Sequence, residues 1–443
     1  MDRPLRLLFT SYRGNMRCGG QGVYLWFLGR ELARLGHEIS VLVGPPLPDA
    51  MPFAREVQEL PDDRFWGKWF ARDRSAFFPP EAPFGVLTPL RFWELGASRI
   101  GFFPEPFAFS VRAFREVAQR LRAGSRWDLV HDVQCLGWGL LGIRALGLPV
   151  VATVHHPLTV DRRASYRRDR TLREAIGTSE FHPVGMQAFV ARRLDRILTS
   201  SQAGAHLIRR DFRVRPERLC ALGNGLDTEL FSPDPNVPRE ASTLLCVGRA
   251  SDPNKGIRVL IEALAKLPPP TRLVLVDEDH PDHEGRRLAE ALGIGERLQI
   301  LGRIETPDLV RRYRSATLVV VPSLYEGFGL PAVEAMACGT PVVASAAGAL
   351  PEVLRATGGG ILVPKGDAEA LARALASLLE RPEQRSRLGA AGRKGVVAAY
   401  SWAGIAAHTA DVYRAVLAER RGRPASTITS AHSGARRARL SRA

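Results

Sequence analysis

The sequence predicts an α/β protein made of two doubly wound, parallel-sheet domains that face each other across a cleft. Short apolar runs alternate with segments whose apolar residues recur at the helical period, as expected for parallel sheets covered by helices on both faces. This alternation occurs twice, in residues 1–215 and again in residues 222–400. A length of 443 residues is enough for two or three domains with separate cores.

The order of strands and helices can be predicted for most of the chain. The first domain should have strands at residues 5–10, 38–43, 128–133, 150–154 and 196–200, with helices at 23–35, 136–146 and 202–211. The second should have strands at 242–247, 272–276, 299–301, 318–321, 341–344 and 361–363. Its helices are expected at 256–266, 284–292, 367–379 and 382–400, with another that Thr306 caps and Pro307 follows. A last helix at 401–420 should precede the tail.

Residues 61–110 interrupt this rhythm. They contain thirteen Phe and Trp residues mixed with Pro and Gly. A structureless segment of this length is unusual unless it covers an active site. Two interpretations remain open: a packed wall of the first domain, or a flap that binds the acceptor or dips into a membrane.

Composition and cysteine spacing suggest a cytoplasmic protein. Hydrophobic residues make up 45% of the chain and charged residues 24%, as in ordinary soluble proteins. Five scattered cysteines without a C-x-x-C pair argue against a zinc ribbon and for reduced thiols. The sequence starts directly with a strand, and we expect neither a secretion signal nor a membrane span.

The net charge of +16 raises the question of a polyanionic partner. Residues 421–443 contain six arginines and no acid, and their composition predicts a disordered basic tail. A second basic cluster lies at residues 161–173. Three interpretations compete: solvated surface, binding of anionic lipid head groups at the inner face of a membrane, and nucleic-acid binding. No nucleic-acid-binding motif supports the third, so nucleic acid is not an expected partner.

The segment 323–341, which reads SLYEGFGLPAVEAMACGTP, is the most informative part of the chain. Glu326 lies in a glycine-rich loop after an apolar strand, and Glu334 lies in the first turns of the next helix. Gly327 and Gly329 allow the backbone to approach a ligand, and a helix N-terminus offers unpaired N–H groups. Two carboxylates around such a loop suit a sugar nucleotide. A structural turn with a solvated glutamate explains the residues equally well.

This segment resembles the Glu-x7-Glu signature of family GT4, which contains retaining glycosyltransferases of the GT-B fold. The resemblance extends over residues 5–420. It implies an acceptor domain at 1–215, a donor domain at 222–400 and a C-terminal helix, 401–420, that crosses back to the first domain; both domains would be Rossmann-like. It also implies that Glu334 binds the ribose hydroxyls, and that Glu326 holds the transferred sugar or stabilises charge at its anomeric carbon. The loop residues that would line the donor are Gly327, Phe328, Gly329 and Leu330, with Ile304 against the base.

Arg249 and Lys255 lie in the loop after the first strand of the second domain. Two cations there can reach one diphosphate and neutralise charge on a departing nucleotide, although surface loops with two cations are common. The sequence of this loop, residues 248–256, resembles the family's Gly-Arg…Lys-Gly element, in a form similar to that of mannosyltransferases acting on phosphatidylinositol. Because these cations would replace a divalent ion at the diphosphate, no metal or other cofactor is expected.

The first domain should contribute two further residues. Gly20 belongs to a glycine cluster that also suits a tight strand-to-helix turn, and the resemblance implies that it contacts the donor phosphates. His155 ends an apolar strand, where histidines are structural as often as catalytic. The resemblance implies that His155, or its neighbour His156, lines the donor sugar.

We therefore expect a metal-independent, retaining glycosyltransferase with His155, Glu326, Arg249 and Lys255 as its catalytic residues. Its partners would be a nucleotide-sugar donor and an acceptor hydroxyl, on a lipid-linked or membrane-associated molecule or on a soluble small molecule or polysaccharide. Retention without an enzyme nucleophile implies front-face attack, with the leaving diphosphate as base. A sugar-nucleotide-binding module without turnover is the alternative from another class. The sugar, the base and the acceptor stay open.

Overall fold

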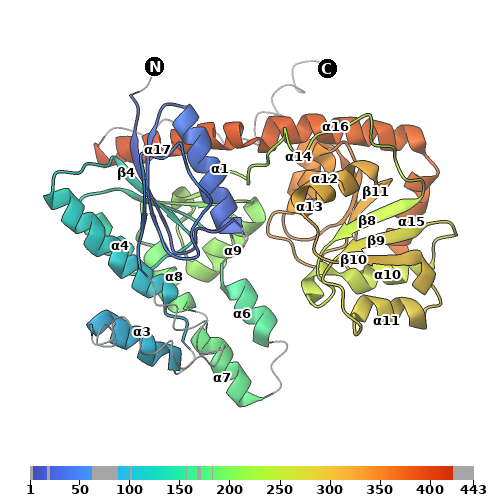
Figure 1. The fold of residues 1–443 in the computed structure, drawn as a ribbon, viewed down its shortest axis with the longest axis horizontal. Helices are drawn as coiled ribbons and strands as arrows, with labels where there is room; N and C mark the ends of the chain where they lie inside the picture. The colour runs from blue at the N-terminus through green and yellow to red at the C-terminus, as the bar shows by residue number, and fades with distance from the viewer. Residues whose placement is uncertain are drawn as a thin grey trace. The chain divides into compact units, whose positions relative to one another are not determined.

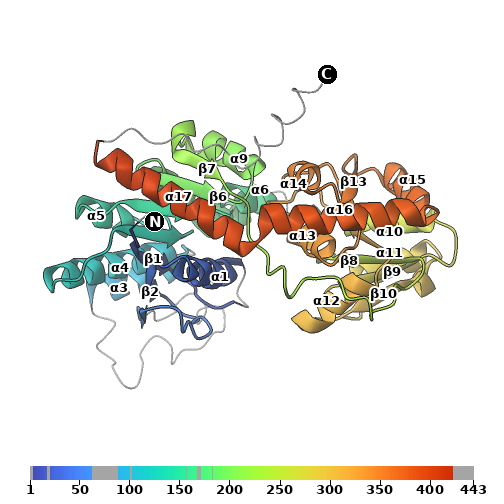
Figure 2. The ribbon, with the colours of Figure 1, turned by 90° about the horizontal axis from the view of Figure 1, so that it is seen from above.

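The computed structural model describes residues 3–16, 20–61, 88–99, 102–155, 157–166, 171–181 and 183–422. The chain divides into two compact units, which can be followed by colour in Figures 1 and 2. Unit 1 contains Met1–Ser200, Gly204–Leu222 and the described chain from Ala406, and unit 2 contains Ser201–Ala203 and Gly223–Ile405. Each unit is built on a parallel sheet, so the predicted α/β, doubly wound class is confirmed.

The sheet of unit 1 has the strand order β3-β2-β1-β4-β5-β6-β7 in the described residues, and all its pairs are parallel. Its strands are β1 (Arg6–Ser11), β2 (Glu38–Val43), β3 (Glu56–Glu59), β4 (Leu129–Val133), β5 (Val150–Thr153), β6 (Arg196–Thr199) and β7 (Leu219–Ala221). Its helices are α1 (Gly20–Arg34), α3 (Pro89–Arg99), α4 (Glu105–Arg122), α5 (Gly139–Ala145), α6 (Thr159–Tyr166), α7 (Leu172–Phe181), α8 (Val184–Ala191) and α9 (Gln202–Phe212).

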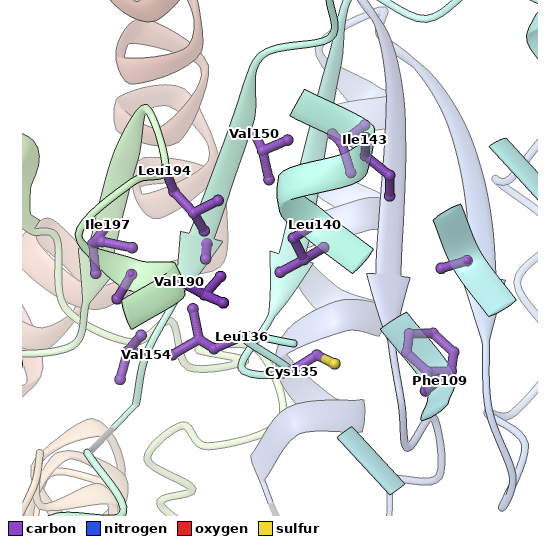
Figure 3. Packing of buried hydrophobic residues seen from close by; sticks show 14 of the residues in the cluster. Phe109, Cys135, Leu136, Leu140, Ile143, Val150, Val154, Val190, Leu194 and Ile197 are labelled. Carbon is purple, nitrogen blue, oxygen red and sulfur yellow. The ribbon is translucent and has the colours of Figure 1, made fainter. Parts of the chain in front are cut away.

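One face of this sheet carries the main core of unit 1. Side chains from α4, α5, α8 and α9 pack there on alternate residues of the central strands, including Val130 and Val150. Figure 3 shows part of this cluster, with Leu140 and Ile143 of α5 beside Val150 of β5. Because β4 and β5 are buried on both faces, their sequences are nearly continuous apolar runs, which is why both were predictable.

The opposite face carries a buried polar chain centred on His131 of β4. Nε2 of His131 lies 2.7 Å from Oγ1 of Thr153, and Nδ1 hydrogen-bonds with the hydroxyl of Tyr413. Thr153 in turn donates to the Tyr24 hydroxyl of α1 at 2.9 Å. Tyr413 lies in α17 (Trp402–Arg420), whose residues from Ala406 belong to unit 1. The last helix thus returns to unit 1 and is anchored there by polar as well as apolar contacts.

The sheet of unit 2 has the strand order β10-β9-β8-β11-β12-β13 and is also parallel. Its strands are β8 (Thr243–Val247), β9 (Arg272–Val276), β10 (Leu298–Leu301), β11 (Leu318–Val321), β12 (Val342–Ser345) and β13 (Gly360–Val363). Its helices are α10 (Ile257–Ala265), α11 (Glu284–Ala291), α12 (Thr306–Ser315), α13 (Leu330–Ala337), α14 (Leu350–Thr357), α15 (Ala368–Leu379) and α16 (Pro382–Tyr400). One core lies between the sheet and α10, α11 and α15, and the other between the sheet and α12, α13, α14 and α16.

Two predicted details are wrong. The helix predicted at residues 136–146 begins at Gly139, because Leu136 has a φ of 51°, in the left-handed region that a right-handed helix excludes. The turn before it is held by Asp132, whose Oδ2 accepts from the amides of Cys135 and Leu136. Thr306 does not cap α12: Glu305 is the N-cap residue and has no side-chain capping bond.

Several elements were not predicted from the sequence, namely β3, β7, α3, α4, α6, α7, α8 and α14. Part of the aromatic segment 61–110 proves to be α3 and the start of α4, where Trp93 packs on Phe107 with ring centroids 4.4 Å apart. Residues 62–87 and 100–101 of the aromatic segment, residues 167–170 of the basic cluster at 161–173, and the tail from 423 lie outside the described residues, so the predictions made for them stay predictions. None of the described helices has the length and apolarity needed to cross a membrane.

Candidate active site

The strand order of unit 2 reverses between β8 and β11, because the chain proceeds from β8 to β9 and β10 on one side and from β11 to β12 and β13 on the other. In open parallel sheets ligands bind at such a switch point, beyond the carboxyl ends of the strands. The loop after β8 carries Arg249 and Lys255, and the loop after β11 carries Glu326. The topology therefore brings these three predicted site residues to one edge of one sheet.

The loop after β8 is shaped by a close approach to the neighbouring strand. Gly256 has a φ of 64°, and a Cβ there would lie 2.1 Å from the carbonyl oxygen of Pro322. Only glycine fits such a position. Asp252 accepts from the Asn254 amide at 3.0 Å and stabilises the turn that precedes Lys255. The loop thus has a defined conformation at the point where it meets the loop after β11.

Lys255 and Glu326 form an ion pair between these two loops. Nζ of Lys255 lies 3.0 Å from Oε2 of Glu326, and the same oxygen accepts from Oγ of Ser323 at 3.1 Å. The Lys255 side chain is 29% exposed and that of Glu326 is 12% exposed, so the pair is partly shielded from water but reachable by a ligand. A cation and a carboxylate held together in this way can bind one sugar nucleotide, the cation through a phosphate and the carboxylate through the hydroxyls of the sugar.

Arg249, unlike Lys255, has no side-chain partner among the residues that the structure describes. Its side chain is exposed, and among the described residues its guanidinium makes no ion pair or hydrogen bond. The planar donor fork of an arginine suits phosphate, so the Arg249 guanidinium, in the same loop as Lys255, can bind an anion.

The loop between Glu326 and α13 is fixed by backbone geometry. Gly329 has a φ of 97°, and a Cβ there would lie 2.7 Å from Cδ2 of Leu350. The carbonyl oxygen of Glu326 accepts from the Ala349 amide at 2.9 Å. Phe328 is buried, with its ring centroid 5.2 Å from that of Tyr400, so only its backbone could meet a ligand. Gly327 is partly exposed and Leu330, the first residue of α13, is 37% exposed.

Glu334 lies on α13 and is held by a residue that the sequence did not reveal. The Tyr313 hydroxyl of α12 donates to Oε2 of Glu334 at 2.7 Å. Burial raises the pKa of Glu334 to about 7, although the hydrogen bond from Tyr313 acts in the opposite direction. One carboxylate oxygen is thus committed to Tyr313, and the other is not used by this bond.

Ile304 follows β10, the edge strand, and is partly exposed. Among the described contacts, none joins Ile304 to Arg249, Lys255, Glu326 or Glu334. Asp277, which directly follows the neighbouring strand β9, was not predicted as a site residue. Oδ2 of Asp277 accepts from the Ala250 amide at 2.6 Å, which ties the end of β9 to the loop that carries Arg249.

Unit 1 holds the other two predicted site residues. Gly20 is the exposed first residue of α1, and a Cβ there would meet no atom within 4 Å, so packing does not require glycine. His155 follows β5; its backbone amide donates to Oε1 of Gln134 at 2.9 Å, and its ring lies edge-on to Tyr24 at 4.9 Å. Gln134 is buried and has a φ of 57°, and its side-chain oxygen holds the His155 amide.

Gly19 and His156, the neighbours of these two residues in the predicted motifs, lie outside the described residues. Within the described part of the chain, no three or more His, Cys, Asp and Glu side chains are grouped as a metal site would require.

Comparison with known proteins finds matches along most of the chain. The family model described as "Glycosyl transferases group 1" matches residues 227–395, and the one described as "Glycosyltransferase Family 4" matches residues 18–230. An MMP alpha-(1->4)-mannosyltransferase of Mycolicibacterium hassiacum is 39% identical over 417 residues, which cover 94% of this chain and 99% of that protein. A D-inositol 3-phosphate glycosyltransferase of Saccharomonospora viridis is 30% identical and covers 92% of each chain. Among solved structures, the sucrose-phosphate synthase of Thermosynechococcus elongatus aligns with a TM-score of 0.66 at 26% identity, over 94% of this chain and 100% of that one.

Proposed function

Since the chain belongs to the GT4-type glycosyltransferases of the GT-B fold, we propose that it transfers a mannosyl group from a nucleotide-diphosphate sugar to a hydroxyl of a glycan acceptor. The relative that is 39% identical along nearly its whole length is a mannosyltransferase that forms an α-(1→4) linkage, which favours that sugar and that bond here. The relatives named for D-inositol 3-phosphate are less similar, at 30% identity for the one from S. viridis, and represent the alternative of a small-molecule acceptor.

The observation that supports the proposal is the ion pair of Lys255 and Glu326 at the switch point of unit 2, where the loop after β8 also carries Arg249. In the proposed complex Arg249 and Lys255 bind the diphosphate. Charge grows on its leaving oxygen as the glycosidic bond breaks, so cations fixed there stabilise the transition state more than the ground state. Glu326 accepts hydrogen bonds from the hydroxyls of the transferred sugar and opposes the positive charge at its anomeric carbon.

The nucleoside would be held further along the same edge. Glu334 offers a carboxylate to the vicinal hydroxyls of the ribose, since its two oxygens have about four acceptor sites and Tyr313 uses one of them. Backbone groups of residues 327–330 lie between the two glutamates in the chain, where the α13 N-terminus favours a negatively charged ligand. Ile304 would contact the base. Gly20 and His155 of unit 1 are proposed for the phosphates and the sugar respectively.

The proposed reaction retains the configuration of the sugar. The bond from the anomeric carbon to the phosphate oxygen breaks, and a bond from that carbon to the acceptor oxygen forms on the same face. The proton of the acceptor hydroxyl passes to the departing phosphate oxygen. Arg249 and Lys255 supply the positive charge that a divalent ion would otherwise bring, so we propose that no metal is needed.

The acceptor and the place of action are proposals of the same kind. The described cysteines Cys135, Cys220, Cys246 and Cys338 are unpaired, which supports a reducing, cytoplasmic setting. A membrane-associated acceptor is the second candidate, because α3 presents Phe92 at 65% and Trp93 at 38% exposure. Aromatic side chains of this kind suit the interface of a lipid bilayer.

The decisive experiment measures nucleotide release and product together. The protein would be incubated with GDP-, UDP- and ADP-mannose, and with the corresponding glucose donors, in the presence of manno-oligosaccharides. We expect one mannose donor to be consumed, the acceptor to gain one hexose, and chelators to leave the rate unchanged. The anomeric proton coupling of the product reports retention. Binding of a donor without turnover on any acceptor would favour a non-catalytic sugar-nucleotide-binding module instead.

A thermal-shift screen of the same donors identifies the base. A true donor at one hundred times its dissociation constant should stabilise the fold by about 2.7 kcal/mol.

A further inference from the structure

We propose that Asp277 and His283 are positioning residues for the donor: they hold the loop after β8 in the conformation that directs Arg249 at the diphosphate. This rests on the proposed function, because the assignment of Arg249 to the diphosphate is made there. Neither residue belongs to the motifs that identify the chain, and neither is placed in contact with the donor.

The starting observation is the isolation of the Arg249 side chain. Because no side chain among the described residues pairs with its guanidinium, the direction of Arg249 is set by the backbone on either side of it. On one side, the Gly248 amide donates to the carbonyl oxygen of Val276 at 3.2 Å, continuing the β8–β9 ladder. On the other side, the Ala250 amide donates to Oδ2 of Asp277 at 2.6 Å. Asp277 is therefore the tether that fixes the backbone on the C-terminal side of Arg249.

Asp277 is itself held in place by two more donors. Its Oδ1 accepts from the Glu278 amide at 2.7 Å, and its Oδ2 also accepts from Nε2 of His283 at 2.9 Å. The Asp277 side chain is 5% exposed and that of His283 is 1% exposed. In the described part of the chain, Asp277 has no ion pair with a lysine or arginine. N–H donors alone therefore compensate the burial of this carboxylate.

The tautomer of His283 follows from its other contact. Nδ1 of His283 accepts from the Gly285 amide at 3.1 Å, which caps the first turn of α11. Since an amide can only donate, Nδ1 carries no hydrogen, and the ring hydrogen lies on Nε2, facing Asp277. The imidazole thus links the N-terminus of α11 to Asp277, and Asp277 in turn links the imidazole to the loop that carries Arg249.

A buried carboxylate next to a diphosphate site repels the ligand, so its presence needs a compensating role. Orienting Ala250, and through it Arg249, is a role that the geometry supports. If His283 served only to cap α11, its hydrogen bond to Gly285 would be enough, and Asp277 would not be needed. The relay from Gly285 to His283, Asp277 and Ala250 ends in the loop that must meet the donor.

The first test does not involve the donor. Amide hydrogen exchange would be measured in ligand-free full-length protein, comparing Asp277→Ala and His283→Phe with wild type and with Asp282→Ala, an exposed neighbour without a described contact. We expect faster exchange at Ala250 in both test variants and no change in Asp282→Ala. His283→Gln keeps a donor and an acceptor and should restore much of the protection. Unchanged exchange at Ala250 in a folded Asp277→Ala or His283→Phe protein overturns the proposal.

The second test couples the tether to Arg249. Asp277→Ala should weaken binding of the preferred nucleoside diphosphate, chosen from GDP, UDP and ADP, about tenfold, which corresponds to about 1.4 kcal/mol. In an Arg249→Ala background the same change should have little further effect, since it acts through the residue already removed. Full additivity overturns the proposal. If wild-type protein binds no nucleoside diphosphate, the proposed function fails, while the exchange experiment still decides whether the tether exists.

Discussion

Nζ of Lys255 lies 3.0 Å from Oε2 of Glu326, so the cation proposed for the diphosphate and the carboxylate proposed for the sugar are each other's partners. The pair joins the loops after β8 and β11, the two strands that flank the switch point of the sheet. In the free protein each group balances the charge of the other. A sugar nucleotide would place a phosphate on Lys255 and sugar hydroxyls on Glu326, so both charges gain contacts without moving apart.

Replacing either proposed diphosphate cation should slow the reaction. We expect Lys255→Ala and Arg249→Ala each to lower kcat by about 10² or more, because each removes a cation facing charge that develops in the transition state. Steady-state kinetics with the identified donor measures this. Arg258→Ala is the matched control, since Arg258 is 80% exposed on α10 and pairs with Glu262 one helical turn away. Unchanged rates in both test variants would mean that the diphosphate binds elsewhere.

Glu334 is expected to matter for binding itself. Glu334→Ala should weaken the affinity for the free nucleoside diphosphate about tenfold or more, because it removes a charged acceptor from the ribose hydroxyls. Isothermal calorimetry with the nucleoside diphosphate measures this directly, with Glu383→Ala on the exposed surface of α16 as control. A variant that loses turnover but keeps its affinity would show that the ribose assignment is wrong.

The raised pKa of Glu334 predicts how that affinity depends on pH. Burial moves this pKa from 4.5 to about 7, so the ionised form, the better acceptor, becomes populated as the pH rises through about 7. Nucleoside-diphosphate affinity should therefore increase over this range. Phosphate groups titrate in a similar range, so Glu334→Gln supplies the baseline: the wild-type increase should exceed that of the variant. Equal pH profiles would contradict the assignment.

The same shift has the opposite effect on stability. A carboxyl group whose folded pKa is raised contributes stability that is complete below its unfolded value and is lost as the pH rises through about 7.

Tyr313→Phe removes the one hydrogen bond that lowers the pKa of Glu334, so it should move the midpoint of the pH dependence of nucleoside-diphosphate binding to higher pH. A midpoint that stays in place would show that Tyr313 does not act on Glu334.

The sequence predicts well those features whose cause is local. The strands β8 and β11 are short apolar runs, and Gly256 and Gly329 stand where the backbone requires glycine, so the loops with Lys255 and Glu326 could be located before the structure was known. The edge strand β3 has the sequence EVQE and is not an apolar run, because it is only partly covered. It was missed for that reason.

Features that depend on distant partners were not predictable. Tyr313 contacts Glu334 from another helix, and Asp277 contacts Ala250 from the loop after another strand, so no spacing in the sequence marks either pair. His131 and Tyr413 are 282 residues apart in the chain. A histidine inside an apolar strand gives no sign of the tyrosine that satisfies it.

That His131–Tyr413 contact yields a prediction for stability. Tyr413→Phe should destabilise the protein by about 1–3 kcal/mol, because Nδ1 of the buried His131 loses its partner. Thermal unfolding measures the loss, with Tyr166→Phe as control, since the Tyr166 hydroxyl bonds to Ser179 at the surface. Equal melting temperatures for the two variants would show that the contact adds no stability.

His131 also sets a pH dependence. Burial lowers the pKa of His131 from 6.5 to about 3. The unfolded chain therefore binds a proton that the folded one does not, and this contribution to stability is present above about 6.5 and is lost as the pH falls. His131→Gln should flatten the acid side of the stability profile relative to wild type. An unchanged acid limb would assign acid unfolding to other groups.

The last prediction concerns the membrane-associated acceptor. We expect peripheral binding to anionic vesicles that weakens with added salt and survives deletion of residues 421–443, because basic residues near an anionic surface contribute about 1 kcal/mol each. In the described part of the basic cluster, Arg163 is already paired with Asp211 at 2.8 Å, so it contributes less than a free arginine would. The exposed aromatic residues of α3 should then carry a larger share of the binding. Phe92→Ser should reduce vesicle binding of the truncated protein, whereas Leu292→Ser, at a 42% exposed leucine of unit 2, should not. Co-sedimentation with vesicles of defined anionic lipid content measures both. If the truncated protein stays in solution at low salt, the membrane-associated acceptor loses its physical support and a soluble glycan becomes the better assignment.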